Sequence, residues 1–197
     1  MKFFETISPA LLISQIFGAV GIFISITIYA GKNRSNIITC KFISDIVWAV
    51  NYTLIGAYTG ALLNVIAMAR ETVFYNRGKK KWASSRLWLY VFILLVLISP
   101  AIDLMKPGVF SIAPLFPAVG STFAVLSFYC MNEKRMRLLG LIAQLLWLVY
   151  GFFPFNPTGI ISCSLTIVSI IIGALRAHKD KTADADTVNI EQKGEKK

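Results

Sequence analysis

Two long stretches without a charged residue constrain the fold of this chain more than any other feature. Residues 6–31 carry no formal charge, and residues 46–69 form a second uncharged block. A soluble helix keeps one face in water and needs no such run, whereas about 20 apolar residues cross the hydrocarbon core of a bilayer. The chain is also 56% hydrophobic and only 15% charged. These features predict an all-α integral membrane protein with several spans.

Apolar stretches and turn residues together predict seven transmembrane helices. Their ranges are 10–30, 37–55, 60–76, 87–105, 109–131, 137–153 and 158–176. The second and third must be separate, because residues 41–77 are too long for one span at about 1.5 Å per residue, and the stretch from Gly56 to Gly60 is typical of a tight turn. The polar tail, residues 178–197, is predicted to be disordered.

Lysine and arginine fall in alternate connections between the predicted helices. The basic connections and the tail contain Lys32, Arg34, Arg77, Lys79, Lys80, Lys81, Arg86, Lys134, Arg135, Arg137, Arg176, Lys179 and Lys181. The second and sixth connections have none, and the fourth has only Lys106. The positive-inside rule then predicts a multi-pass protein of the cytoplasmic membrane, with its N-terminus outside and its C-terminus in the cytoplasm. The same placement argues against nucleic acid as the reason for the net charge of +10.

The sequence matches itself when it is shifted by 99 residues. The non-apolar and aromatic matches are Asn33 with Asn132, Trp48 with Trp147, Thr59-Gly60 with Thr158-Gly159, and Arg77 with Arg176. Both copies begin outside in the predicted topology, so the repeat is parallel, an arrangement that some transporters use. We therefore expect a first three-helix repeat in residues 1–80, a linker helix in 81–107, and a second repeat in 108–177, before the tail.

This 3+1+3 arrangement resembles the SWEET, SemiSWEET and PQ-loop superfamily of small-solute transporters. More closely, the chain resembles the YgjV-type bacterial inner-membrane proteins, up to about Arg176. The resemblance depends on the helix around Trp48, the turn Gly56-Ala57-Tyr58, Asn64 with Arg70, and Pro117-Ala118-Val119-Gly120. It implies the seven-helix fold and a place in the inner membrane.

The transporter resemblance also implies a substrate site. Sugar-transporting relatives hold substrate between a second-helix Trp and a third-helix Asn, which Trp48 and Asn64 match here. In the second half Trp147 matches, but Cys163 replaces the Asn. The Pro-Gln pair of the family's first helix is missing, which puts sugar specificity in doubt. Asn51, Gln144 and Tyr150 are further candidates, and all of these residues are equally open to a role in helix packing.

Three ionisable residues, Asp45, Arg70 and Glu71, fall inside predicted spans, where charges are costly and usually turn inward. Asp45 precedes Tyr58 by 13 residues and Arg70 follows it by 12. Both would therefore lie about 18 Å below the turn. We expect Asp45 and Arg70 to be partners, and Glu71 to point toward another helix or the inner interface. Lys41 lies one turn below Asp45 on the same face, where it can pair with Asp45 or extend to the inner interface. The counterparts of Asp45 and Arg70 in the repeat, Gln144 and Ser169, are neutral, so a coupling site and a structural pair both stay open.

Two pairs of residues are candidate hinges. Gly18 and Gly21 loosen the first helix or permit close packing. Pro114 and Pro117 remove backbone donors from the fifth. Each pair fits a rocking motion of one bundle against the other, or a static kink or packing notch.

The sequence contains no nucleotide-binding loop, no paired carboxylates or Ser/His set at membrane depth, and no metal cluster. We therefore expect no enzyme, cofactor or metal. The predicted function is a secondary transporter or facilitator of a small polar solute, working by alternating access between the two bundles. The alternative is a non-transporting scaffold or sensor of the same fold, with a dry bundle interface. A monomer and a homodimer in the bilayer both remain open.

Overall fold

The computed structural model of the chain describes residues 9–30, 34–105, 111–130 and 133–172, which form seven helical spans. The helices are α1 (Pro9–Ala30), α2 (Arg34–Leu54), α3 (Tyr58–Asn76), α4 (Leu87–Ile98) continued by α5 (Ala101–Leu104), α6 (Leu115–Tyr129), α7 (Glu133–Phe152) and a last helix, Pro157–Ile172. A short 3-10 helix, η1 (Trp82–Ser84), precedes α4. The predicted all-α, seven-span fold is confirmed. The tail predicted to be disordered lies outside the described residues.

Prolines set two helix boundaries that differ from those expected. The fourth span is broken between α4 and α5 at Pro100, because proline has no N–H and its ring clashes with the preceding turn. The fifth span was expected from residue 109, but α6 begins at Leu115, directly after Pro114. Pro117 then lies in the first turn of α6, where a missing N–H costs no helical hydrogen bond.

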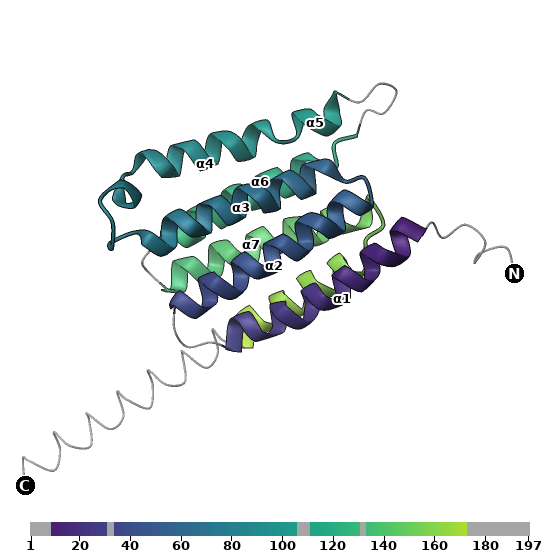
Figure 1. Cartoon of the computed structure of the whole chain (residues 1–197), viewed down its shortest axis with the longest axis horizontal. Helices are drawn as coiled ribbons and strands as arrows, with labels where there is room; N and C mark the ends of the chain where they lie inside the picture. The colour runs from purple at the N-terminus through teal and green to yellow at the C-terminus, as the bar shows by residue number, and fades with distance from the viewer. Residues whose placement is uncertain (1–8, 31–33, 106–110, 131–132, 173–197) are drawn as a thin grey trace, which may run out of the picture.

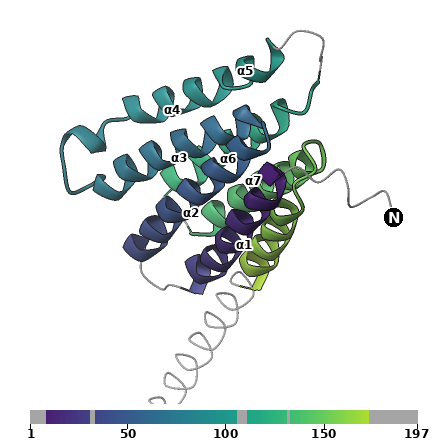
Figure 2. The same ribbon diagram turned by 45° about the vertical axis from the view of Figure 1, so that its right-hand side comes forward.

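The helices form two layers that lie face to face (Figures 1 and 2). In Figure 1, α1, α2 and α3 lie side by side in one layer, with the last helix, α7 and α6 behind them in that order. Helices α4 and α5 run along one edge of the bundle, where α4 packs on both α3 and α6. The pairing of α1 with the last helix and of α3 with α6 is the one that a two-fold axis between α2 and α7 would produce.

Burial differs from that of a soluble protein, because charged and amide side chains are buried while large apolar side chains are exposed. Asp45, Asn51 and Glu71 are fully buried, at 0% exposure, while Phe23 is 76% exposed. Two stretches, Leu87–Leu104 and Arg135–Phe152, are long and apolar enough to cross a membrane, and shorter apolar helices accompany them. The buried charged residues Asp45, Arg70 and Glu71 all lie on α2 and α3, so these two helices are less apolar although they lie inside the bundle. A polar interior and an apolar surface suit a bundle surrounded by lipid.

The two halves of the bundle share a glycine–tryptophan contact at positions 99 residues apart. A Cβ placed on Gly21 would lie 2.9 Å from the ring of Trp48, and one placed on Gly120 would lie 3.2 Å from the ring of Trp147. In each half, the glycine therefore lets the first helix approach the indole of the second.

The hairpin turns after α2 and α7 also match. The Ala57 N–H donates to the Tyr52 carbonyl at 2.9 Å, and the Asn156 N–H donates to the Gly151 carbonyl at 2.9 Å. These two bonds are again 99 residues apart. The repeat and its limits stay a prediction, which these matched contacts support.

Candidate functional site

Four aromatic side chains from α2 and α7 meet where the two layers face each other, and we call Trp48, Tyr52, Trp147 and Tyr150 the aromatic layer. Tyr52 is its hub: ring centroids lie 6.2 Å from Trp48, 5.6 Å from Trp147 and 5.9 Å from Tyr150. Trp48, Tyr52 and Tyr150 are buried and Trp147 is partly buried. The aromatic layer therefore joins the first half of the chain to the second.

Gly60 makes this packing possible. A Cβ at Gly60 would lie 2.9 Å from the Tyr52 ring and 3.2 Å from the Tyr150 ring. The start of α3 therefore reaches both tyrosines only because residue 60 has no side chain.

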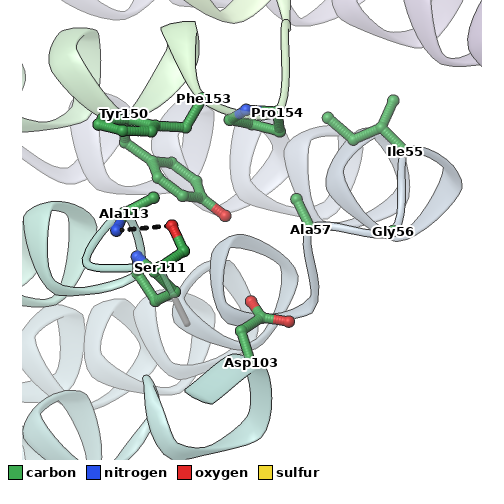
Figure 3. A pocket seen from close by; sticks show the side chains of 10 residues that line it. Ile55, Gly56, Ala57, Asp103, Ser111, Ala113, Tyr150, Phe153 and Pro154 are labelled. Carbon is green, nitrogen blue, oxygen red and sulfur yellow. Dashed lines mark hydrogen bonds between the residues drawn. The ribbon is translucent and has the colours of Figure 1, made fainter. Parts of the chain in front are cut away.

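A pocket of about 200 Å³ opens at the end of the bundle that holds the α2–α3 turn (Figure 3). It is lined by Ile55, Gly56, Ala57, Asp103, Ser111, Ala113, Pro114, Tyr150, Phe153 and Pro154. These residues come from both halves and from the connecting span, and Tyr150 belongs to the aromatic layer as well. We call this the Asp103 pocket.

Asp103 is the acidic residue of the pocket and also supports the fold. Its Oδ2 accepts the Thr59 N–H at 2.8 Å, which satisfies one of the free donors at the start of α3. The Ser111 hydroxyl accepts the Ala113 N–H at 3.2 Å, a bond drawn in Figure 3. The pocket thus presents a carboxylate and the hydroxyls of Ser111 and Tyr150 to a ligand. Asp103 was not among the predicted site residues, although an acidic residue near the end of an apolar span is a signal for one.

A buried amide network ties three helices together. Asn51 Nδ2 donates to the Ser14 carbonyl at 2.6 Å, and its Oδ1 accepts from Asn156 Nδ2 at 2.7 Å. Asn156 Oδ1 in turn accepts from Thr158 Oγ1 at 3.0 Å and from the Gly159 N–H at 3.2 Å. Asn156 is therefore the N-cap of the last helix, followed by proline at the first helical position. The Asn-Pro sequence signals that cap, but not its bond to Asn51.

A cavity shared by Trp48, Asn64 and Trp147 stays a prediction, and two of these residues bond within the protein. Asn64 Nδ2 donates to the Gly60 carbonyl of its own helix at 2.8 Å, and Trp147 Nε1 donates to Ser121 Oγ at 3.2 Å. The Asp103 pocket includes none of the three. The side-chain donors of Asn64 and Trp147 are therefore satisfied within the protein, because the helix rotations turn them toward neighbouring backbone and side chains. Cys163 is buried, and Gln144 is partly buried.

Four charged residues, Lys41, Asp45, Arg70 and Glu71, lie inside the bundle, and we call them the charge cluster. The expected Asp45–Arg70 pair is wrong. Asp45 pairs with Lys41, which lies four residues earlier on the same face of α2. Arg70 Nη2 lies 3.2 Å from Glu71 Oε1, and its guanidinium is 4.8 Å from the centroid of the Phe128 ring.

Glu71 was expected to face another helix or the inner interface, and it lies within the bundle beside Arg70. It is fully buried, at 0% exposure. The reason is the central position of α3, which packs against α2, α4 and α6 and so has neighbours on several faces.

The glycines proposed as hinges lie in tight contacts. A Cβ on Gly18 would lie 2.0 Å from Thr158 Oγ1, so α1 and the last helix touch at this point. Gly21 meets the Trp48 ring, as described above. Pro114 caps α6 and lines the Asp103 pocket, and Pro117 is buried in the first turn. These contacts favour packing roles, and the hinge roles stay predictions.

The fold and burial define a class, the multi-helical integral membrane proteins. A family model described as a bacterial inner membrane protein, Imp-YgjV, matches residues 12–181. The chain therefore belongs to the YgjV family of bacterial inner membrane proteins, as the sequence resemblance indicated. Searches of curated proteins and of solved structures found no match. The relation to the SWEET and PQ-loop superfamily stays a prediction.

Proposed function

We propose that the protein is a secondary transporter or facilitator of a small polar solute, which moves by alternating access between the two halves of the bundle. The observation that carries this proposal is the Asp103 pocket, which both halves and the connecting span line together. Relative movement of the halves would change the shape of such a pocket. The aromatic layer lies next to it through Tyr150 and provides a barrier of packed rings.

The size and polarity of the pocket define the class of solute. Its volume of about 200 Å³ is below the range of about 300–1,000 Å³ for sites that hold drug-sized ligands. Asp103, Tyr150 and Ser111 offer one carboxylate and two hydroxyl groups. A solute of a few non-hydrogen atoms with hydrogen-bond donors or a positive charge fits these groups best.

The distribution of basic residues supports an orientation for this pocket. Arg77, Lys79, Lys80, Lys81 and Arg86 lie in the α3–α4 connection, and Arg135 and Arg137 lie near the start of α7. In Figure 1 these connections are at the opposite end of the bundle from the α2–α3 turn. With the basic end in the cytoplasm, the Asp103 pocket faces the outside, and the N-terminus is outside as well.

A ligand screen followed by a flux assay tests the proposal. The purified protein is heated with a panel of small polar metabolites, because a ligand at about 100 times its Kd raises native stability by about 2.7 kcal/mol. Hits are then tested for uptake into proteoliposomes. Tyr150→Phe should weaken both responses, whereas Tyr90→Phe, at a side chain 66% exposed on α4, should change neither.

The scaffold or sensor alternative is favoured by one observation, the satisfied polar groups of Asn51, Asn64 and Trp147. If no metabolite shifts the melting temperature and no hit is taken up, the transporter proposal fails and the scaffold remains. If a ligand binds but does not cross the membrane, the result identifies a sensor.

A further inference from the structure

The charge cluster combines two cations and two carboxylates away from solvent. Asp45 and Glu71 are both 0% exposed, and Arg70 is 3% exposed. Each cation serves one oxygen of one carboxylate: Lys41 binds Asp45 Oδ1, and Arg70 binds Glu71 Oε1. The Lys41 side chain is 22% exposed and is the part of the cluster nearest to solvent.

The remaining carboxyl oxygens have no donor. Asp45 Oδ2 and Glu71 Oε2 are buried, and neither receives a hydrogen bond from the residues that the structure describes. The Asp45 and Glu71 side chains lie close enough to interact electrostatically across the contact between α2 and α3. Ionised carboxylates only accept hydrogen bonds, so two of them side by side cannot bond to each other. The one unpartnered donor of the cluster, the buried Nε of Arg70, bonds to neither of them in the described structure. A single proton supplies the missing donor.

We propose that Asp45 and Glu71 form a proton-binding site, in which the two carboxyl groups share one proton. Binding forms an O–H bond on one carboxyl and an O–H···O hydrogen bond to the other, and release returns the proton to water. Two carboxyl groups held in contact cannot readily both be ionised. The site stands without transport, but its use to couple solute movement to protons rests on the proposed function.

A proton fits this site better than a metal ion. Bound Ca²⁺ takes about 6–8 oxygen ligands and Mg²⁺ takes six. No group of three or more His, Cys, Asp or Glu residues in the described part of the chain is arranged to hold a metal. The positive charges of Lys41 and Arg70 would also repel a divalent metal ion.

Infrared spectroscopy tests the site without any transport assay. At neutral pH, exposed carboxyls are ionised, so a C=O stretching band of a protonated carboxyl reports a buried one. We expect this band in the wild type and its loss in Asp45→Asn, in Glu71→Gln and in the double variant. Asp103→Asn, at the acidic residue of the Asp103 pocket, should keep the band. The proposal is overturned if the wild type lacks the band, if the double variant keeps it, or if Asp103→Asn removes it.

The pH dependence of stability gives a second readout. A native state that holds a proton which the unfolded state has lost becomes less stable as pH rises. The wild-type melting temperature should therefore fall as pH rises from about 5, where unfolded carboxyls have lost their protons, and level off at the alkaline pH where the native site loses its proton. Glu71→Gln should remove this dependence and still fold, because its amide donates to Asp45 as the protonated acid does.

Other titrating groups near the site need controls. Lys41 and Arg70 are its charged neighbours on α2 and α3, and the Cys163 thiol of the last helix interacts electrostatically with Lys41. Cys163→Ser should keep the loss of stability with rising pH. If the melting temperature differs between sodium and choline at fixed pH and the infrared band is absent, the site binds a metal cation, and the proton-binding proposal is refuted. Loss of uptake with the band intact would refute transport alone.

Discussion

The amide network allows a sharp test of how the two halves are held together. Asn51 is fully buried and bonds to the Ser14 carbonyl of α1 at 2.6 Å and to Asn156 at 2.7 Å. Asn51→Ala removes both bonds and leaves the Asn156 amide without its acceptor. Asn156 is also 0% exposed, so its amide is shielded from bulk solvent.

The size of the effect follows from the bonds that are lost. Hydrogen bonds between membrane helices average about 0.6 kcal/mol each, and a stranded buried polar group costs about 1–3 kcal/mol. Asn51→Ala should therefore lower the free energy of unfolding by about 2–4 kcal/mol. For a chain of this length that corresponds to a fall in melting temperature of about 4–16 °C.

Asn76 provides the matched control for a melting experiment in detergent. Its amide donates to the Thr72 carbonyl of its own helix at 2.8 Å, in an exposed position. Asn76→Ala should change stability by no more than about 0.5 kcal/mol. If Asn51→Ala melts within the error of Asn76→Ala, the bond between the halves does not stabilise the bundle, and the reasoning from burial is refuted.

Two further substitutions probe contacts of single residues. Gly18→Ala places a methyl group 2.0 Å from Thr158 Oγ1 and should lower the free energy of unfolding by about 1–3 kcal/mol or more in a melting assay. Gly140→Ala, whose nearest neighbour lies at 3.6 Å, should be tolerated. Equal effects of the two substitutions would contradict the close contact of α1 with the last helix. Asp103→Ala removes the acceptor of the Thr59 N–H and should lower the free energy of unfolding by about 0.5–2 kcal/mol. Asp103→Asn keeps a carbonyl oxygen and should lower it by less. The opposite order would exclude a capping role for Asp103.

The parts of this protein that sequence predicts well are those set by local chemistry. The α2–α3 turn was predicted from Gly56 and its neighbours, and Gly56 does have a positive φ of 73°. The span limits were close to those observed wherever no proline intervened. The apolar pattern places the start of the fifth span at residue 109, too early, because apolar residues alone do not show that Pro114 precedes the first helical residue, Leu115.

The side-chain partners could not be predicted in the same way. Counting residues from the turn gives the depth of Asp45 and Arg70 but not the rotation of each helix, and one residue turns a side chain by about 100°. Lys41 competes successfully for Asp45 because it lies on the same helix. Whether Asn64 faces a cavity or its own backbone is likewise decided by packing, which leaves no local trace in the sequence.

The pairing within the charge cluster bears on how the chain enters the membrane. Lys41 and Asp45 neutralise each other within α2, and Arg70 and Glu71 do so within α3. Each helix can therefore leave the translocon as an electrically balanced segment, before it meets any other helix. Isolated charges at the bilayer centre cost about 2.5–3.5 kcal/mol each during insertion, and a pair between helices would be unavailable at that moment. Replacing Lys41 or Arg70 alone would thus impair biogenesis at the insertion step, before the bundle assembles.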